Sequence, residues 1–120
     1  MKIRYSEANN VKLAEIISDE IIIHTTQDIL DMMADISYQG VERIIIHERN
    51  LTPEFFNLKT GIAGEIPQKF SNYNMRLAII GDFSKYPGKS LMAFIYESNK
   101  TGRISFVNAL NEAVIKLTKN

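Results

Sequence analysis

A chain of 120 residues, 45% of them hydrophobic, is long enough to bury one core and too short for two, so we expect a single domain over residues 1–120. Its 14 basic and 14 acidic residues cancel, which argues against nucleic acid or an anionic membrane as a partner. The absence of cysteine excludes disulfides, thiol catalysis and thiolate metal sites. No apolar segment has the length of a membrane-spanning helix or a signal peptide, so we expect a cytoplasmic protein.

The chain should open with an antiparallel pair of strands. Residues 2–7 and 11–18 are rich in residues that favour strands, and Asn9-Asn10 between them tolerates the positive φ of a tight hairpin turn. Three consecutive isoleucines at residues 21–23 predict a further short strand or an extension of the second one.

A helix should follow the isoleucines. Thr25 and Asp28, three residues apart, form the pattern of an N-terminal capping box. Apolar residues then recur at helical spacing to about Tyr38, and Gly40 can end the helix in the left-handed conformation.

Two short, continuous apolar segments at residues 43–47 and 75–81 predict strands that are buried on both faces of a parallel sheet. Between them, residues 60–72 carry apolar positions at helical spacing and predict a helix. Pro67 lies inside this helix, where it removes one backbone hydrogen bond and should cause a kink.

The last third of the chain predicts a polar loop at residues 82–88, a helix at 89–98, a strand at 103–107 and a final helix capped by Asn108. A hairpin followed by alternating strands and helices indicates an α/β fold. We expect a single mixed sheet that opens with an antiparallel hairpin and continues with parallel strands joined by right-handed crossovers. Ligands of such sheets bind beyond the carboxyl ends of the strands.

That edge of the sheet would present His47, Glu48, Asp82 and Ser84. His47 and Glu48 are neighbours in a strand and point to opposite faces, so they cannot easily bind one metal ion, and we expect neither a metal nor a cofactor. Two interpretations of His47 remain: a partly buried, hydrogen-bonded side chain, or a general base that Asp82 or Asn108 orients. Asp82 itself either caps its loop or binds a ligand.

A second candidate site is the start of the helix at residues 60–72. Thr60-Gly61 would expose unpaired N–H groups and the positive end of the helix dipole, which suits a phosphate or another anion. The alternative is a plain helix cap. Lys59 precedes the glycines, so this segment is no phosphate-binding loop of the GxxxxGK[ST] type.

The order hairpin, helix, strand, helix, strand, helix, strand, helix resembles the small α/β fold of the anti-sigma-factor antagonist (STAS) domains. The segment NLKTGIAGEI then lies where those domains carry an Asp-Ser-Ser-Gly signature, at the start of a helix that follows a central strand. The resemblance implies that Thr60 occupies the position that kinases phosphorylate, with Gly61 beside it. The sequence departs from the signature at Lys59, which replaces a serine, and at Leu58, which replaces the aspartate.

A resemblance in sequence covers nearly the whole chain. The blocks IIIHERNLTPEFF, LKTGIAGEI, QKFSNY, LAIIGDFSKY and FIYESNK resemble the bacterial family named domain of unknown function 4180. That resemblance implies one fold-sized unit of about this length and supplies no activity.

These features favour a non-enzymatic, STAS-like regulatory or binding module that acts through a partner protein or a small anionic ligand and is switched by phosphorylation of Thr60. The alternative is a small hydrolase or transferase with His47 as base and Asp82 as the residue that orients it. A third interpretation is a subunit of a larger assembly, which an exposed Phe55 or Phe56 would indicate, and self-association stays open.

Overall fold

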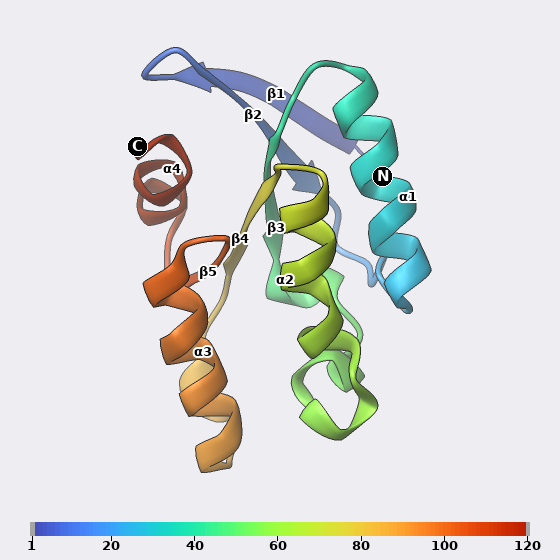
Figure 1. Cartoon of the computed structure of the whole chain (residues 1–120), viewed down its shortest axis with the longest axis vertical. Coiled ribbons are helices and arrows are strands. Elements are labelled where there is room, and N and C mark those ends of the chain that lie inside the picture. Colours follow the sequence, from blue (N-terminus) through green and yellow to red (C-terminus); the bar gives the residue numbers. More distant parts are fainter. Residues whose placement is uncertain (1, 120) are drawn as a thin grey trace.

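The computed structural model describes residues 2–119 and consists of one five-stranded mixed sheet with four helices (Figure 1). The strands lie side by side in chain order; β1 is antiparallel to β2, and β2 to β5 are parallel. This confirms the predicted fold class. In chain order, the strands and α-helices are β1 (Lys2–Ala8), β2 (Val11–Ile17), α1 (Thr26–Tyr38), β3 (Arg43–His47), α2 (Ile62–Asn72), β4 (Arg76–Ile80), α3 (Lys89–Thr101), β5 (Ile104–Val107) and α4 (Leu110–Thr118).

The local signals at the start of the chain are confirmed. Asn9 and Asn10 have φ of 53° and 65° and make the hairpin turn, which pairs β1 with β2 along their full length. The Thr25 side chain accepts a hydrogen bond from the Asp28 backbone N–H, and the Asp28 carboxylate caps the Thr25 N–H in return.

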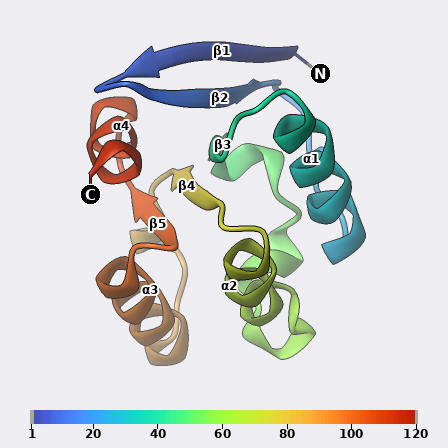
Figure 2. The same ribbon diagram turned by 45° about the horizontal axis from the view of Figure 1, so that its top comes forward.

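The two faces of the sheet are covered differently. Helices α1, α2 and α3 pack on one face, as right-handed crossovers between neighbouring parallel strands require. Their core buries Phe70 of α2 against Ile44 and Ile79 of the central strands. Helix α4 alone packs on the other face, where Ala113 and Leu117 contact β4 and β5, and Figure 2 shows it apart from the other three helices.

The isoleucine run at residues 21–23 is not a strand. Ile23 makes one isolated bridge to Leu51, because both the Ile22 and Ile23 N–H groups donate to the carbonyl of Asn50. The Asn50 side chain is fully buried and donates to the carbonyls of Ser18 and Glu20, at 2.8 and 2.9 Å. Asn50 therefore fixes the segment after β2 against the end of β3.

Two predicted helix starts were wrong. Helix α2 begins at Ile62 rather than Thr60, because Thr60 ends a short 3-10 helix, η3 (Leu58–Thr60), and Gly61 follows with φ of +82°. Asn108 does not cap α4, whose N-cap is Ala109; instead the Asn108 N–H donates to the Glu112 carboxylate. Within residues 2–119 no helix is both long and apolar enough to cross a membrane.

Candidate functional site

Glu48, which begins the 3-10 helix η1 (Glu48–Asn50) directly after β3, makes several polar contacts at the carboxyl edge of the sheet. Its side chain is only 12% exposed. The carboxylate accepts hydrogen bonds from the Tyr86 hydroxyl and the Asp82 N–H, and it pairs with the Lys85 ammonium at 2.8 Å. These contacts attach the loop after β4 to the end of β3.

Gly81 makes room for this carboxylate. A Cβ atom at Gly81 would lie 2.6 Å from the Glu48 Cβ and 2.7 Å from its Oε1, closer than real Cβ contacts allow. The Gly81 N–H meanwhile donates to the Val107 carbonyl and holds the residue in line with β5. The sequence therefore needs glycine here because Glu48 occupies the space of a side chain.

Tyr86 links the polar contacts to an aromatic cluster. Its ring stacks on Phe56 with centroids 4.5 Å apart and planes 17° apart, and Phe56 also contacts Phe55 and Phe83. Burial, and then the neighbouring Glu48 carboxylate, raise the pKa of the Tyr86 hydroxyl above its ordinary value. Phe55 and Phe56 are 1% and 6% exposed, so neither shows the exposure that would indicate a subunit of a larger assembly.

Both phenylalanines can be buried because they belong to a 3-10 helix, η2 (Pro53–Phe56), whose tight turn sends consecutive side chains in different directions. Phe55 enters the main core, while Phe56 is covered by the rings of Tyr86 and Phe83. The covering rings come from the loop that Glu48 holds in place.

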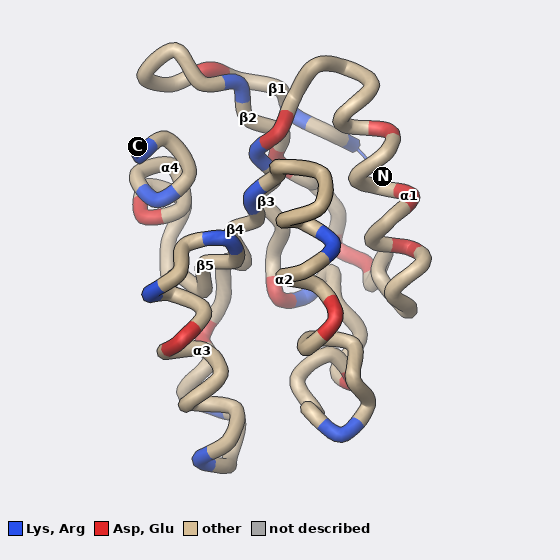
Figure 3. Tube along the Cα trace, in the orientation of Figure 1, with Lys and Arg blue, Asp and Glu red and all other residues tan. Residues whose placement is uncertain are grey.

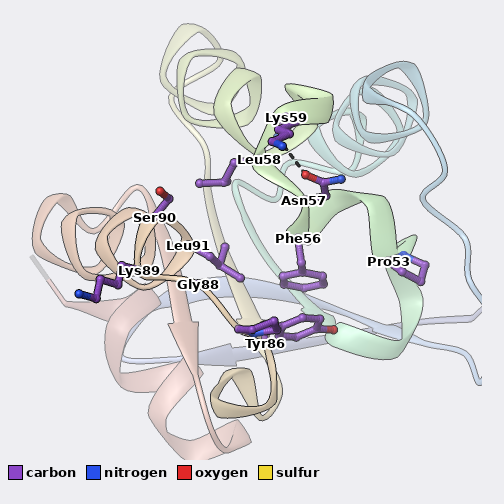
Figure 4. Close-up of a pocket in the computed structure, with 11 residues that line it drawn as sticks. Pro53, Phe56, Asn57, Leu58, Lys59, Tyr86, Gly88, Lys89, Ser90 and Leu91 are labelled. Atoms are coloured by element: carbon purple, nitrogen blue, oxygen red, sulfur yellow. Dashed lines mark hydrogen bonds between the residues drawn. The ribbon is translucent and has the colours of Figure 1, made fainter.

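A groove of about 710 Å³ opens beside this cluster, between the segment at 53–59 and the segment at 86–91 (Figure 4). The Phe56 and Tyr86 rings lie one over the other, with Leu58 and Leu91 beside them. The lining contains two lysines and no acidic residue. It consists of Pro53, Phe56, Asn57, Leu58, Lys59, Tyr86, Pro87, Gly88, Lys89, Ser90 and Leu91.

His47 ends β3 and Glu48 begins η1, and the two side chains bond to different parts of the fold. The carboxylate beside His47 is Glu15 of β2, with His47 Nε2 3.0 Å from Glu15 Oε2, and Arg4 lies 3.7 Å from the same carboxylate group. Within residues 2–119 no hydrogen bond or ion pair joins His47 to Asp82.

Asp82 acts on its own loop. Its Oδ1 accepts hydrogen bonds from the Ser84 hydroxyl and N–H, at 2.6 and 3.1 Å, and so begins the 3-10 helix η4 (Phe83–Lys85). These bonds to Ser84 lower the pKa of the Asp82 carboxyl. The carboxylate therefore serves as a loop cap in this structure.

The Thr60 residue is exposed, but its hydroxyl is engaged. It donates to the carbonyls of Glu54 and Asn57, at 2.8 and 2.9 Å, and closes the turn between η2 and η3. Thr60 and Gly61 are outside the groove lining, whereas Lys59 contributes to it. No group of three or more histidine, aspartate and glutamate side chains able to hold a metal occurs within residues 2–119.

A family model described as "Domain of unknown function (DUF4180)" matches residues 8–117, which is nearly the whole chain. The chain belongs to the DUF4180 family. The match contains all of the groove and the Glu48 contacts. No curated protein and no solved structure shows significant similarity to the chain.

Sequence reasoning missed three residues that organise this DUF4180 domain. Glu15 is separated from His47 by 32 positions, and the bond between them follows from the pairing of β2 with β3. Tyr86 lies in the predicted loop at residues 82–88, and its bond to Glu48 joins residues 38 positions apart. Asn50 gave no signal beyond its position after a strand, and its role depends on the tertiary contacts of residues 18–23.

Proposed function

We propose that this DUF4180 domain is a non-enzymatic binding module that takes a small anionic ligand with an apolar body into the groove between residues 53–59 and 86–91. The observation that carries this proposal is the composition of the lining, which combines aromatic and aliphatic side chains with two lysines and no acid. Sites for small molecules have this character, with apolar walls and a few polar groups that orient the ligand.

The walls of the groove provide the area for binding. The partly buried Leu58 and Tyr86 offer apolar surface beside the buried Phe56 and Leu91, and burying such surface is favourable by about 25 cal/mol per Å². The Tyr86 hydroxyl is already bonded to Glu48, so a ligand would meet the edge and face of a held ring rather than a mobile phenol. A preorganised wall reduces the conformational entropy that the protein loses on binding.

The lysines select the charge of the ligand. Lys59 belongs to the first segment and Lys89 to the second, and both residues are exposed. The Asn57 side chain accepts a hydrogen bond from the Lys59 N–H at 3.2 Å, which fixes the backbone from which the lysine extends (Figure 4). The ammonium groups of these two exposed lysines can attract an anion, and in the free protein they stay in water, so no charge is buried.

The lining also explains why binding is favoured over catalysis. It contains no histidine, carboxylate or cysteine that could transfer a proton or attack a substrate. Its one phenol, on Tyr86, has a raised pKa and donates to Glu48.

The test is a pair of probes that differ only in charge: 1-naphthoate and the neutral 1-naphthylmethanol, each titrated by calorimetry. The naphthoate should bind and the alcohol should bind more weakly. Replacing both lysines (Lys59→Gln with Lys89→Gln) should weaken naphthoate binding about tenfold, because each exposed charge contact contributes about 0.7 kcal/mol.

Lys116→Gln is the matched control, since Lys116 is an exposed lysine of α4 outside the groove lining. It should leave the affinity unchanged. Equal affinity for the two probes, or equal loss in the control, would overturn the proposal.

The regulatory part of the proposal concerns Thr60. A phosphate on Thr60 would remove the hydroxyl donor that holds the carbonyls of Glu54 and Asn57 and would add close to two negative charges. We propose that this opens the turn, displaces Lys59 and so weakens ligand or partner binding. Thr60→Glu should weaken that binding, and phosphopeptide mapping of residues 57–69 on protein from its own cells tests whether the modification occurs.

A second candidate function rests on the His47–Glu15 pair. A histidine 3.0 Å from a mostly buried carboxylate has the geometry of an oriented general base, so the hydrolase or transferase alternative would use Glu15 as the orienting group. Hydrolysis of p-nitrophenyl esters and phosphates that is lost in His47→Gln would support it. Equal rates for the wild type and His47→Gln would remove it.

A further inference from the structure

Two neighbouring parallel strands, β3 and β4, begin with arginine, and a third arginine, Arg103, directly precedes β5. Arg43 is the register partner of Arg76, and Arg76 and Arg103 each directly precede the next paired residues, Leu77 and Ile104. These three residues, hereafter the arginine row, lie at the amino edge of the sheet, beside the end of α4. Figure 3 shows blue segments where β3, β4 and β5 begin. The row is at the opposite end of the strands from the groove.

Like charges in register repel each other, so the row has a cost for the fold. Burial first, and then the charges of Arg76 and Arg103, lower the pKa of Arg43, while Glu42 acts in the opposite direction. Within residues 2–119 no carboxylate forms an ion pair with any of the three guanidinium groups. Among the described residues, Glu42 is the one carboxylate that acts on the pKa of Arg43, and it forms no ion pair with the row.

The guanidinium groups are nevertheless held in place by main-chain carbonyls. Arg43 Nε donates to the Leu117 carbonyl at 3.0 Å, Arg76 Nη1 to Lys119 at 3.0 Å, and Arg103 Nη1 to Met75 at 2.9 Å. Arg43 Nη1 donates in addition to the carbonyl of Glu42. Each guanidinium has five N–H donors, so these four bonds use a minority of the donors of the row.

A hollow of about 350 Å³ lies beside Arg43, lined also by Lys12 of β2 and by Glu42. Glu42 is the one acidic residue of that lining, and two basic side chains face it. The hollow gives a ligand access to Arg43, the first member of the row, from the side of the hairpin.

We propose that the arginine row is a second binding site, for a phosphate-bearing small ligand such as a diphosphate. Guanidinium groups bind phosphate oxygens by paired, charge-assisted hydrogen bonds, and a fixed row of them matches a group with several anionic oxygens. The charge repulsion that the fold tolerates is relieved when such a ligand is bound. This site does not depend on the groove, since no residue lines both hollows.

The test is calorimetric titration of the whole chain with pyrophosphate in 150 mM chloride. The wild type should show saturable binding at one site. Arg43→Gln, Arg76→Gln and Arg103→Gln should each weaken it about tenfold or more, which is the loss expected when a hydrogen bond to a charged group is removed. Arg49→Gln is the matched control, because Arg49 is an exposed arginine at the other edge of the sheet, and it should bind as the wild type does.

Arg43→Lys keeps the charge but loses the paired donors, so it should also weaken pyrophosphate binding while its melting temperature stays close to that of the wild type. This variant keeps the proposal testable if a glutamine variant fails to fold. No saturable binding by the wild type would overturn the proposal. Variants that change the melting temperature but not the affinity for pyrophosphate would also overturn it, since the row would then only cap the end of α4.

Discussion

The two ends of the same parallel strands carry basic residues of different kinds and in different settings. At the amino edge, arginines at or just before the starts of β3, β4 and β5 bond to main-chain carbonyls, and the connections are short. At the carboxyl edge two long segments, residues 48–61 after β3 and 81–88 after β4, fold over each other and leave a groove between them.

The difference shows what a sheet edge needs in order to form a cavity. The carboxyl edge has chain length for two walls and one buried carboxylate, Glu48, that fixes them together. The amino edge lacks such loops and presents charges directly on the strands. We therefore expect substitutions at the carboxyl edge to change stability strongly and those at the amino edge to change it weakly.

The largest effect should come from Phe56→Ala. Phe56 is buried among Phe55, Phe83 and Tyr86, and truncating a buried phenylalanine costs about 3–5 kcal/mol in free energy of unfolding. Urea denaturation measures this. Tyr73→Ala, at a tyrosine that is 62% exposed, is the control and should change stability by less than about 0.5 kcal/mol.

Gly81→Ala should have the next largest effect, a loss of about 1–3 kcal/mol, because the added methyl group would overlap with Glu48. Gly64→Ala is the matched control: nothing lies within 4 Å of the added Cβ, and alanine favours the interior of α2 by about 1 kcal/mol. A destabilised Gly64→Ala with an unchanged Gly81→Ala would show that Glu48 does not occupy the position described.

Tyr86→Phe should change how stability depends on pH. The pKa of Tyr86 is raised in the folded state, so its contribution is complete below the unfolded value of about 10 and is lost as the pH rises further. The wild type should therefore lose more stability than Tyr86→Phe between pH 10 and the highest pH at which both still fold. Parallel curves for the two proteins would contradict the Glu48–Tyr86 bond.

The smallest effect should be at the amino edge. Arg103→Gln removes one hydrogen bond to the Met75 carbonyl but also relieves charge repulsion in the arginine row, so we expect a change of about 1 kcal/mol or less. A loss as large as that of Phe56→Ala would show that the two edges contribute equally to stability.

The sequence predicted the parts of the fold that depend on neighbouring residues. Thr25 and Asp28 cap α1 within one turn, Asn9-Asn10 makes its own hairpin turn, and the apolar segment at 43–47 forms a strand in any parallel sheet. The isoleucine run at 21–23 does not form the predicted strand. Its N–H groups at Ile22 and Ile23 donate to the carbonyl of Asn50, a fully buried residue that is far away in sequence.

The groove could not be predicted from the sequence. Its two sides are about thirty residues apart, and they meet only because Glu48 reaches Tyr86 and Gly81 leaves space for it. The sequence did indicate the carboxyl edge of the sheet, where the groove lies, since ligands gather at the carboxyl ends of parallel strands. It chose Asp82 as the partner of His47, whereas pairing of β2 with β3 brings Glu15 there.

The most direct test of the proposed binding function is titration of ¹⁵N-labelled protein with 1-naphthoate, followed by amide chemical shifts. The account predicts that the shifts concentrate at residues 53–59 and 86–91, on both sides of the groove, and that 1-naphthylmethanol causes smaller ones. Shifts centred on His47 and Glu15, or no saturable shifts at all, would contradict it.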